Sequence, residues 1–153
     1  DMLSPPFEPH SVDLIYSEGA VYNVGLDAAL DAWIPLLKPG GCVVFSDVGF
    51  VVDEPPAEAV AFWADQYPGM NTPDEAKQLA CGKGLEWVDH YWMPKQGWNA
   101  YYEPISRRIQ ELAEEWADSD VGMQVVTAMK NEVGVYQRYG DSYGYYFMVL
   151  RKV

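Results

Sequence analysis

The sequence predicts an α/β fold, in which helices pack against a buried sheet. Residues 42–45 are a short apolar run without polar alternation, as expected for a strand buried on both faces, and residues 12–17 are a second apolar strand. Residues 26–37, between them, have the apolar spacing of an amphipathic helix. Strand, helix and strand in succession make up an α/β layer.

A sharp turn is expected between this helix and the second strand. Pro39 disfavours helical dihedral angles at Lys38 and cannot donate a hydrogen bond to the preceding turn. Gly40 and Gly41 tolerate positive φ and let the backbone reverse. We therefore expect the helix to run over 26–37 and the strand to follow directly.

Two loops that contain prolines flank this unit. Three prolines exclude regular structure from residues 1–10. The second loop, 47–56, ends with two prolines, which are well tolerated in the first turn of a helix. A helix is therefore predicted over 57–67.

The next helix has a strong start signal. Thr72 and Glu75 form a capping-box pattern, and Pro73 takes the first helical position. Two glycines after Cys81 end this helix, and the apolar and aromatic residues of 85–93 predict the next strand.

Two long helices and a final strand complete the chain. Residues 98–104 lead into a helix with one apolar stripe and an acidic, solvated opposite face. The stripe consists of Ile105, Ile109, Leu112 and Trp116. A second amphipathic helix covers 120–139 and ends at Gly140, and the aromatic run 143–150 predicts the last strand.

Several motifs in this chain occur in the order and spacing of a known enzyme family. They are Asp1-Met2-Leu3, Pro6-Phe7, Ser11 to Ile15, Ser17 to Gly25, Leu37 to Gly41, and Ser46-Asp47. Together they resemble the second half of a class I S-adenosylmethionine-dependent methyltransferase, of the small-molecule, ubiquinone-biosynthesis-like (type 11) branch. The resemblance covers essentially the whole chain. It implies the second half of a Rossmann-like sheet, about four strands with the last antiparallel, with flanking helices and a helical insertion before the last strand.

The glycine-rich cofactor motif of that family is missing. Such enzymes open with a strand and a glycine-rich loop that meets the cofactor. The close glycine pairs here, Gly40-Gly41 and Gly82 with Gly84, neither follow a strand nor open a helix as that motif requires. We therefore expect residues 1–153 to be a single partial methyltransferase domain, the C-terminal part of a longer, truncated protein. A natural half-length protein is the alternative.

The charge balance argues against several partners. The 23 acidic and 10 basic residues give a net charge of −13, which repels nucleic acid and anionic membranes. Neither is expected as a partner. Two cysteines, Cys42 and Cys81, fit a reducing cytoplasm better than a disulfide framework, so a cytoplasmic location is expected.

The resemblance implies residues that bind the cofactor S-adenosylmethionine. Asp1 and Met2 match the positions that hold the adenine, although a solvated chain end is the alternative. Ser17, Glu18 and Gly19 would lie at the carboxyl end of the first strand, where open parallel sheets bind ligands. There they would face the methionyl part of the cofactor.

Candidate catalytic residues follow the same strand. Methyl transfer requires a nucleophile held in line with the methyl group rather than a metal. No metal site is expected, since His10 and His90 are isolated. Glu18 and Tyr22 are the candidates, although Glu18 is equally expected as a cap for the following helix. Asn23 occupies the place where many relatives carry a histidine, so no histidine base is assumed.

Aromatic residues are expected at the acceptor. Trp92, Trp98, Tyr101 and Tyr102 lie in the stretch that covers the substrate pocket in relatives. Aromatic faces there would contact the cofactor cation or a flat substrate. We expect Tyr22, Trp92, Trp98 and Tyr102 to contact the substrate, with core packing as the alternative for each.

The sequence thus predicts S-adenosylmethionine-dependent methyl transfer to a small molecule in a longer protein, with this chain inactive by itself. One alternative is a non-catalytic dimeric binding module derived from the methyltransferase fold. Another is an enzyme supplied in two chains. Without a preceding strand, the run 12–17 would expose its edge, and apolar open edges pair with other chains. A homodimer through this edge is expected.

Overall fold

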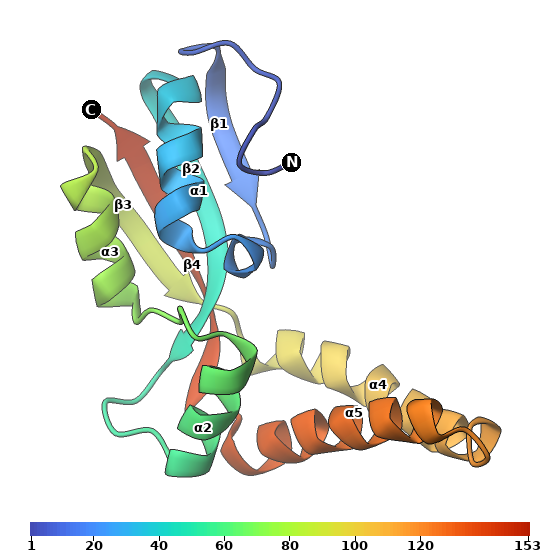
Figure 1. Ribbon diagram of the computed structural model, residues 1–153. Coiled ribbons are helices and arrows are strands. Elements are labelled where there is room, and N and C mark those ends of the chain that lie inside the picture. The colour runs from blue at the N-terminus through green and yellow to red at the C-terminus, as the bar shows by residue number, and fades with distance from the viewer.

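The computed structural model describes all 153 residues, which form four strands and five α-helices (Figure 1). The elements are β1 (Val12–Ser17), α1 (Leu26–Trp33), β2 (Leu37–Phe50), α2 (Ala57–Gln66), α3 (Pro73–Gly82), β3 (Leu85–Trp92), α4 (Lys95–Glu115), α5 (Asp120–Tyr139) and β4 (Tyr143–Lys152). Two short 3-10 turns, Val21–Asn23 and Ile34–Leu36, precede and follow α1.

The strands form one sheet in the order β1-β2-β4-β3. β1 and β2 are parallel, whereas β4 runs antiparallel to both of its neighbours. The expected α/β class, with four strands of which the last is antiparallel, is therefore confirmed. β1 pairs with β2 alone and forms one edge of the sheet.

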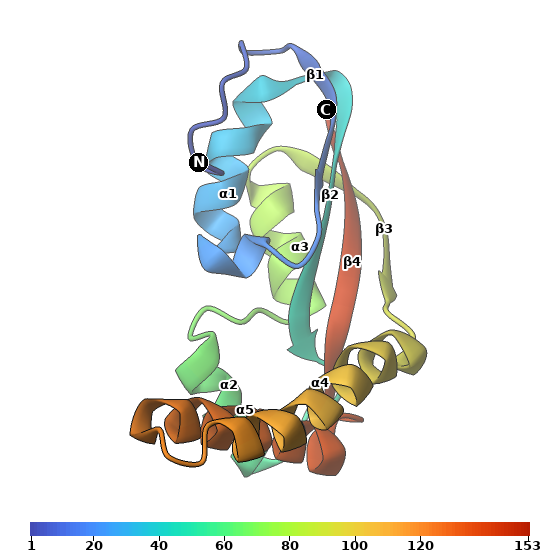
Figure 2. The ribbon, with the colours of Figure 1, turned by 90° about the vertical axis from the view of Figure 1, so that its right-hand side faces the viewer.

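The helices occupy two regions. α1 and α3 lie on the same side of the sheet, as the view in Figure 2 shows. α2 and the hairpin formed by α4 and α5 gather at the end toward which β1 and β2 run (Figures 1 and 2). This second group contains the helical insertion expected before the last strand.

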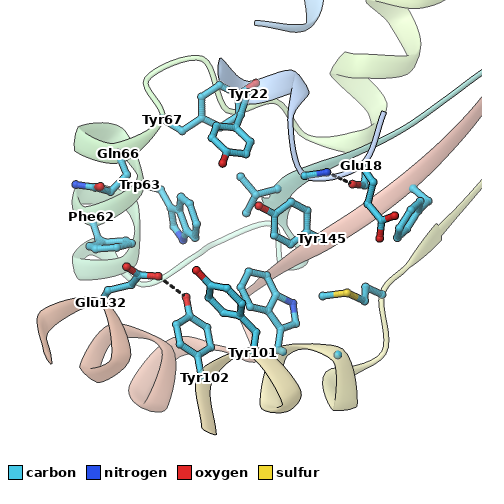
Figure 3. Close-up of a pocket in the computed structure, with 17 residues that line it drawn as sticks. Glu18, Tyr22, Phe62, Trp63, Gln66, Tyr67, Tyr101, Tyr102, Glu132 and Tyr145 are labelled. Atoms are coloured by element: carbon cyan, nitrogen blue, oxygen red, sulfur yellow. Dashed lines mark hydrogen bonds between the residues drawn. The ribbon is translucent and has the colours of Figure 1, made fainter. Parts of the chain in front are cut away.

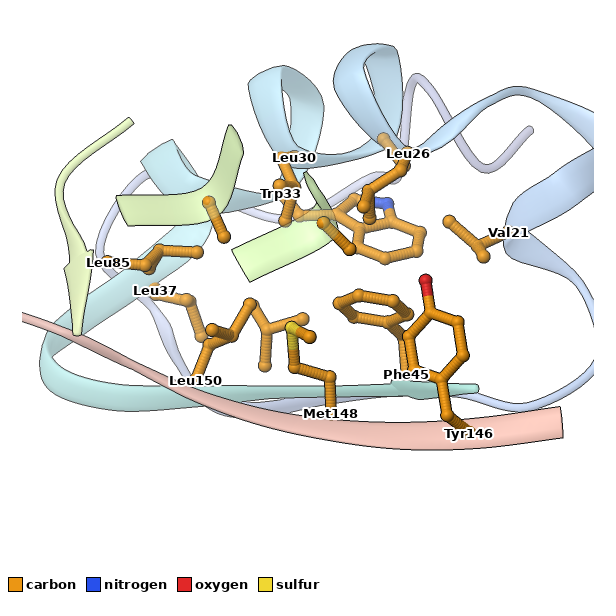
Figure 4. Packing of buried hydrophobic residues seen from close by; sticks show 14 residues of the cluster. Val21, Leu26, Leu30, Trp33, Leu37, Phe45, Leu85, Tyr146, Met148 and Leu150 are labelled. Atoms are coloured by element: carbon orange, nitrogen blue, oxygen red, sulfur yellow. The ribbon is translucent and has the colours of Figure 1, made fainter. Parts of the chain in front are cut away.

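The first hydrophobic cluster fills the space between α1, α3 and the sheet (Figure 4). Leu26 and Leu30 of α1 face Phe45 and Met148 of the strands, and all four are at most 2% exposed. Burying each such side chain contributes roughly 1.5–3 kcal/mol before the entropy of ordering is subtracted. This cluster fixes β1 and β2, whose carboxyl ends carry the predicted site.

The second hydrophobic cluster joins α2, α4 and α5 to the carboxyl end of β2 and the amino end of β4. Val48 of β2 and Tyr143 of β4 extend the sheet into this cluster, where they meet Trp98 and Tyr136 of the helical hairpin. The two clusters therefore share the β2–β4 ladder.

The predicted helix over 26–37 is wrong at its end. α1 ends at Trp33, residues 34–36 form a 3-10 turn, and Leu37 already belongs to β2. Pro35 explains the early end, because it has no N–H to donate to the carbonyl of Asp31. The glycine turn lies inside the irregular start of β2, where Gly40 has a φ of 78°.

Two further boundaries differ from the expectation. β2 continues to Phe50 instead of giving way to a loop at Asp47, because Val48 to Phe50 pair with β4. α4 begins at Lys95 rather than after Pro104, which lies inside the helix at the cost of one backbone hydrogen bond. The other predicted helices and strands are confirmed to within a few residues.

Candidate functional site

A cavity of about 490 Å³ opens at the carboxyl ends of β1 and β2, enclosed by α2, α4 and α5 (Figure 3). Nine of its 17 lining residues are aromatic. Its two acidic residues are Glu18 and Glu132, and no lysine, arginine or histidine lines it. The lining is therefore apolar with a negative charge at two places.

One wall of the cavity is a stack of aromatic rings. Trp98 and Tyr102 are four residues apart, which places them on the same face of α4. Their rings are nearly parallel with centroids 5.7 Å apart, and Tyr102 stacks in turn on Tyr136 of α5 at 4.3 Å. These contacts hold the wall rigidly against the helical hairpin.

Glu132 of α5 is fixed by this wall. The hydroxyl of Tyr102 donates to Glu132 Oε1 at 3.1 Å. Burial, together with the nearby carboxylate of Glu132, raises the pKa of Tyr102, so the hydroxyl stays protonated and remains a donor. Figure 3 shows the carboxylate of Glu132 between the side chains of α2 and those of α4.

The loop after β1 forms the opposite side of the cavity. Gly19 has a φ of 56°, and its N–H donates to Ser46 Oγ at 2.8 Å. The hydroxyl of Tyr16 donates to Glu18 Oε2 at 3.0 Å. These bonds hold Glu18 at the carboxyl end of the edge strand.

A buried carboxyl group, that of Asp47, contacts a residue that lines the cavity. Asp47 is fully buried; Oδ1 accepts from the N–H of Val48 at 2.9 Å and Oδ2 from the hydroxyl of Tyr67 at 3.1 Å. Burial raises the pKa of Asp47 from 3.8 to about 6, although both hydrogen bonds lower it. Tyr67 also lines the cavity and packs edge-to-face on Tyr22.

Asp47 makes the stability of the fold depend on pH. Because its pKa in the folded state is above 3.8, the unfolded chain releases the proton first as the pH rises. As the pH rises from 3.8 to about 6, the carboxyl group therefore lowers the free energy of unfolding. Above about pH 6 the loss amounts to about 3 kcal/mol.

We expect Tyr67→Phe to lower the free energy of unfolding by about 1 to 2 kcal/mol at about pH 8, and by less at about pH 5. The variant removes a donor that favours the carboxylate, so the pKa of Asp47 rises further and the loss continues to higher pH. Urea unfolding at both pH values measures this. Tyr22→Phe, from the same ring pair, is the control and should change little. A loss of equal size at both pH values would contradict the role of Asp47.

A second cavity, of about 510 Å³, follows the open edge of β1. Met2, Ser17 and Glu18 line it, beside the apolar side chains of Phe7 and Trp33. The indole N–H of Trp33 donates to the carbonyl of Met2 at 2.9 Å, which ties the N-terminal segment to α1.

The two cavities separate the predicted site residues. The residues expected at the substrate that line the first cavity are Tyr22, Trp98 and Tyr102, and Gly19 lines it too. The expected cofactor residues Met2, Ser17 and Glu18 line the second cavity. Glu18 alone lines both.

Two predicted residues lie elsewhere. Asp1 is exposed and accepts from the N–H of Leu3 at 2.9 Å, and it lines neither cavity. Trp92 packs edge-to-face on Tyr146 and lines neither cavity. Their contacts with a ligand stay predictions.

Sequence reasoning missed Glu132 and the pair formed by Asp47 and Tyr67. Glu132 lies next to Val133 in the apolar stripe of α5, which is a weak signal for an inward-facing charge. Asp47 ends an otherwise apolar run, but nothing local indicates that Tyr67 reaches it. No group of three potential metal ligands lies close enough to hold an ion, and no helix is long and apolar enough to cross a membrane.

The fold is that of class I S-adenosylmethionine-dependent methyltransferases. A methyltransferase from Geobacter sulfurreducens, in complex with S-adenosyl-L-homocysteine, superposes with a TM-score of 0.75 at 16% identity, over 96% of this chain and 60% of that protein. Phosphoethanolamine N-methyltransferase 2 of Haemonchus contortus, in complex with phosphomonomethylethanolamine and S-adenosylhomocysteine, gives 0.71 at 20% identity, over 99% of this chain and 36% of that protein.

The same fold occurs in a protein of another activity. The [4+2]-cyclase SpnF gives a TM-score of 0.69 at 19% identity, over 99% of this chain and 53% of that protein. The chain spans between 36% and 63% of the length of these and similar structures. No protein-family model and no curated protein sequence matches it.

Proposed function

We propose that this chain supplies the acceptor-binding part of an S-adenosylmethionine-dependent methyltransferase that acts on a small molecule. The aromatic cavity at the carboxyl ends of β1 and β2 carries the proposal, since ligands bind at this edge of open α/β sheets. Its volume of about 490 Å³ suits a small molecule. The similar structure from Haemonchus contortus, which holds a small acceptor and S-adenosylhomocysteine, supports it.

The second cavity suits the cofactor. Phe7 and Trp33 provide an apolar wall, and Ser17 and Glu18 provide polar groups, which match a flat ring with a polar tail. When bound, S-adenosylmethionine supplies a methyl carbon on a positively charged sulfur, open to direct displacement. In this proposal Met2, Ser17, Glu18 and Gly19 contact it, together with Asp1.

The acceptor is positioned by residues of this chain. Glu18, which lines both cavities, orients the acceptor nucleophile toward the second cavity. Tyr22 contacts the acceptor from the same side. Trp98 and Tyr102 form the apolar wall that excludes water. Trp92, at the end of β3, is proposed as a further contact of the acceptor, although it lines neither cavity here.

The test is the affinity for S-adenosylmethionine, measured by calorimetry. We expect the 153-residue chain alone to bind weakly and be inactive, because it spans only 36% to 63% of the similar structures described above. A longer protein that contains it should bind and transfer methyl groups. In that protein Asp1→Ala should weaken binding by about 1 to 3 kcal/mol.

Glu8→Ala, in the same segment, is the matched control and should leave the affinity unchanged. Micromolar binding by the chain alone, with one site per chain, would show that S-adenosylmethionine binding does not need residues outside this chain. A longer protein without affinity for S-adenosylmethionine would refute the transferase proposal itself.

One observation favours a second candidate, a non-catalytic dimeric binding module. Leu14 and Tyr16 on the open edge of β1 are 56% and 57% exposed. We propose that in the 153-residue chain this edge pairs with a second copy. A cytoplasmic location is part of the proposal and is supported by the free thiols of Cys42 and Cys81.

A further inference from the structure

Glu132 is an unpaired charge in an apolar setting. Its side chain is partly buried, and its one hydrogen bond comes from the neutral hydroxyl of Tyr102. No lysine, arginine or histidine forms an ion pair with it, although eight ion pairs occur elsewhere in the molecule. A partly buried carboxylate without a counter-ion is costly, and a cation that reaches it would be stabilised.

Aromatic side chains surround this carboxylate. Phe62 and Trp63 of α2 lie on one side of Glu132, and Tyr101 and Tyr102 of α4 lie on the other (Figure 3). Aromatic faces attract cations, most strongly where water is excluded. We call Glu132 with these four residues the cation subsite.

The cation subsite lies away from the cofactor side. Figure 3 shows Glu132 and Glu18 at opposite sides of the cavity. Glu18 is the residue that lines both cavities, so a molecule in the first cavity would approach the second cavity at Glu18 and reach the cation subsite with its other end. A cation bound at Glu132 would therefore belong to the acceptor rather than to the sulfonium of the cofactor.

We propose that the acceptor carries an organic ammonium group, and that the cation subsite binds this group while the reacting end lies near Glu18. A methylated ammonium fits better than a guanidinium, because the subsite offers one carboxylate and several ring faces rather than paired acceptors. The proposal rests on the proposed function for the identity of the acceptor. Binding of the ammonium group itself depends only on residues of this chain.

The experiment compares choline with its neutral carbon isostere, 3,3-dimethylbutan-1-ol, in calorimetric titrations of the 153-residue chain. Both probes have the same shape, so the difference in affinity reports the charge. We expect choline to bind at least about tenfold more tightly. Equal affinities, or no binding of choline, would overturn the proposal.

Glu132→Gln keeps an oxygen that accepts from Tyr102 and removes the charge. We expect it to weaken choline binding about tenfold and to leave the isostere unaffected. Glu114→Gln is the matched control: Glu114 is exposed on α4 and does not line the cavity, so the same change in net charge should have no effect. Equal effects of both variants would mean that choline binding depends only on the net negative charge of the chain. That result would overturn the proposed cation subsite.

Tyr101→Leu tests the aromatic part separately. Tyr101 is 55% exposed, so the fold tolerates the change, and leucine keeps the apolar volume without the ring face. We expect weaker binding of choline and unchanged binding of the isostere. These titrations contain no S-adenosylmethionine. Choline binding would therefore stand if the longer protein failed to bind the cofactor, and the two proposals fail separately.

Discussion

Replacing Trp98 by alanine should lower the free energy of unfolding by about 3 to 5 kcal/mol, the largest stability effect we expect in this chain. Trp98 is 5% exposed, and its ring lies between 5.1 and 6.0 Å from the rings of four tyrosines. Two of these rings belong to the α4–α5 hairpin and two to β4. The alanine variant would leave a void where the hairpin joins the sheet.

Urea unfolding followed by circular dichroism measures this effect, at one protein concentration because association would shift the midpoint. Tyr101→Ala is the control on the same helix. Its ring is 55% exposed, and we expect a loss below about 1 kcal/mol. Similar losses for Trp98→Ala and Tyr101→Ala would show that the ring stack contributes little to the second cluster.

Leu14→Lys should convert a dimer into a folded monomer and halve the mass measured by light scattering. Leu14 is 56% exposed on β1, an edge strand whose free backbone groups would pair with a second copy. One lysine on each copy brings two positive charges together at the two-fold contact, and their repulsion opposes pairing. Tyr16→Lys, two residues along the same strand, should act in the same way.

Val121→Lys is the control for this experiment. Val121 is 71% exposed at the start of α5, so the substitution adds the same charge at an exposed apolar position far from β1. It should leave the mass unchanged, while circular dichroism confirms that all variants are folded. A monomeric wild-type chain, or a Leu14→Lys variant that is still dimeric, would refute association through this edge.

Local signals in the sequence predicted most of the elements. The capping box at Thr72 is an example, because both of its reciprocal hydrogen bonds are present and α3 begins there. Pro35 is an equally local signal, and it predicts the observed end of α1 better than Pro39 does. The extension of β2 to Phe50 depends instead on β4, whose residues follow some ninety positions later, so no local pattern indicates it.

The site residues that lie on one helix could be predicted from the sequence, whereas those brought together by tertiary packing could not. Trp98 and Tyr102 share one face of one helix, and their common position in the cavity follows from their spacing. Glu132 is brought to them by the packing of α5 on α4, and Tyr67 reaches Asp47 across 20 residues of chain. Such pairs are products of tertiary structure and cannot be derived from the periodicity of one element.

The β2–β4 ladder is continuous, but the side chains along it belong to two separate clusters. Phe45 and Met148 pack with α1 and α3, whereas Val48 and Tyr143 pack with α2, α4 and α5. Substitutions in groups that share no contacts have nearly additive effects. The helices that line the first cavity can therefore change in sequence without disturbing the packing of α1 and α3 on the sheet. The architecture is modular: new specificities can evolve in one part without redesign of the other.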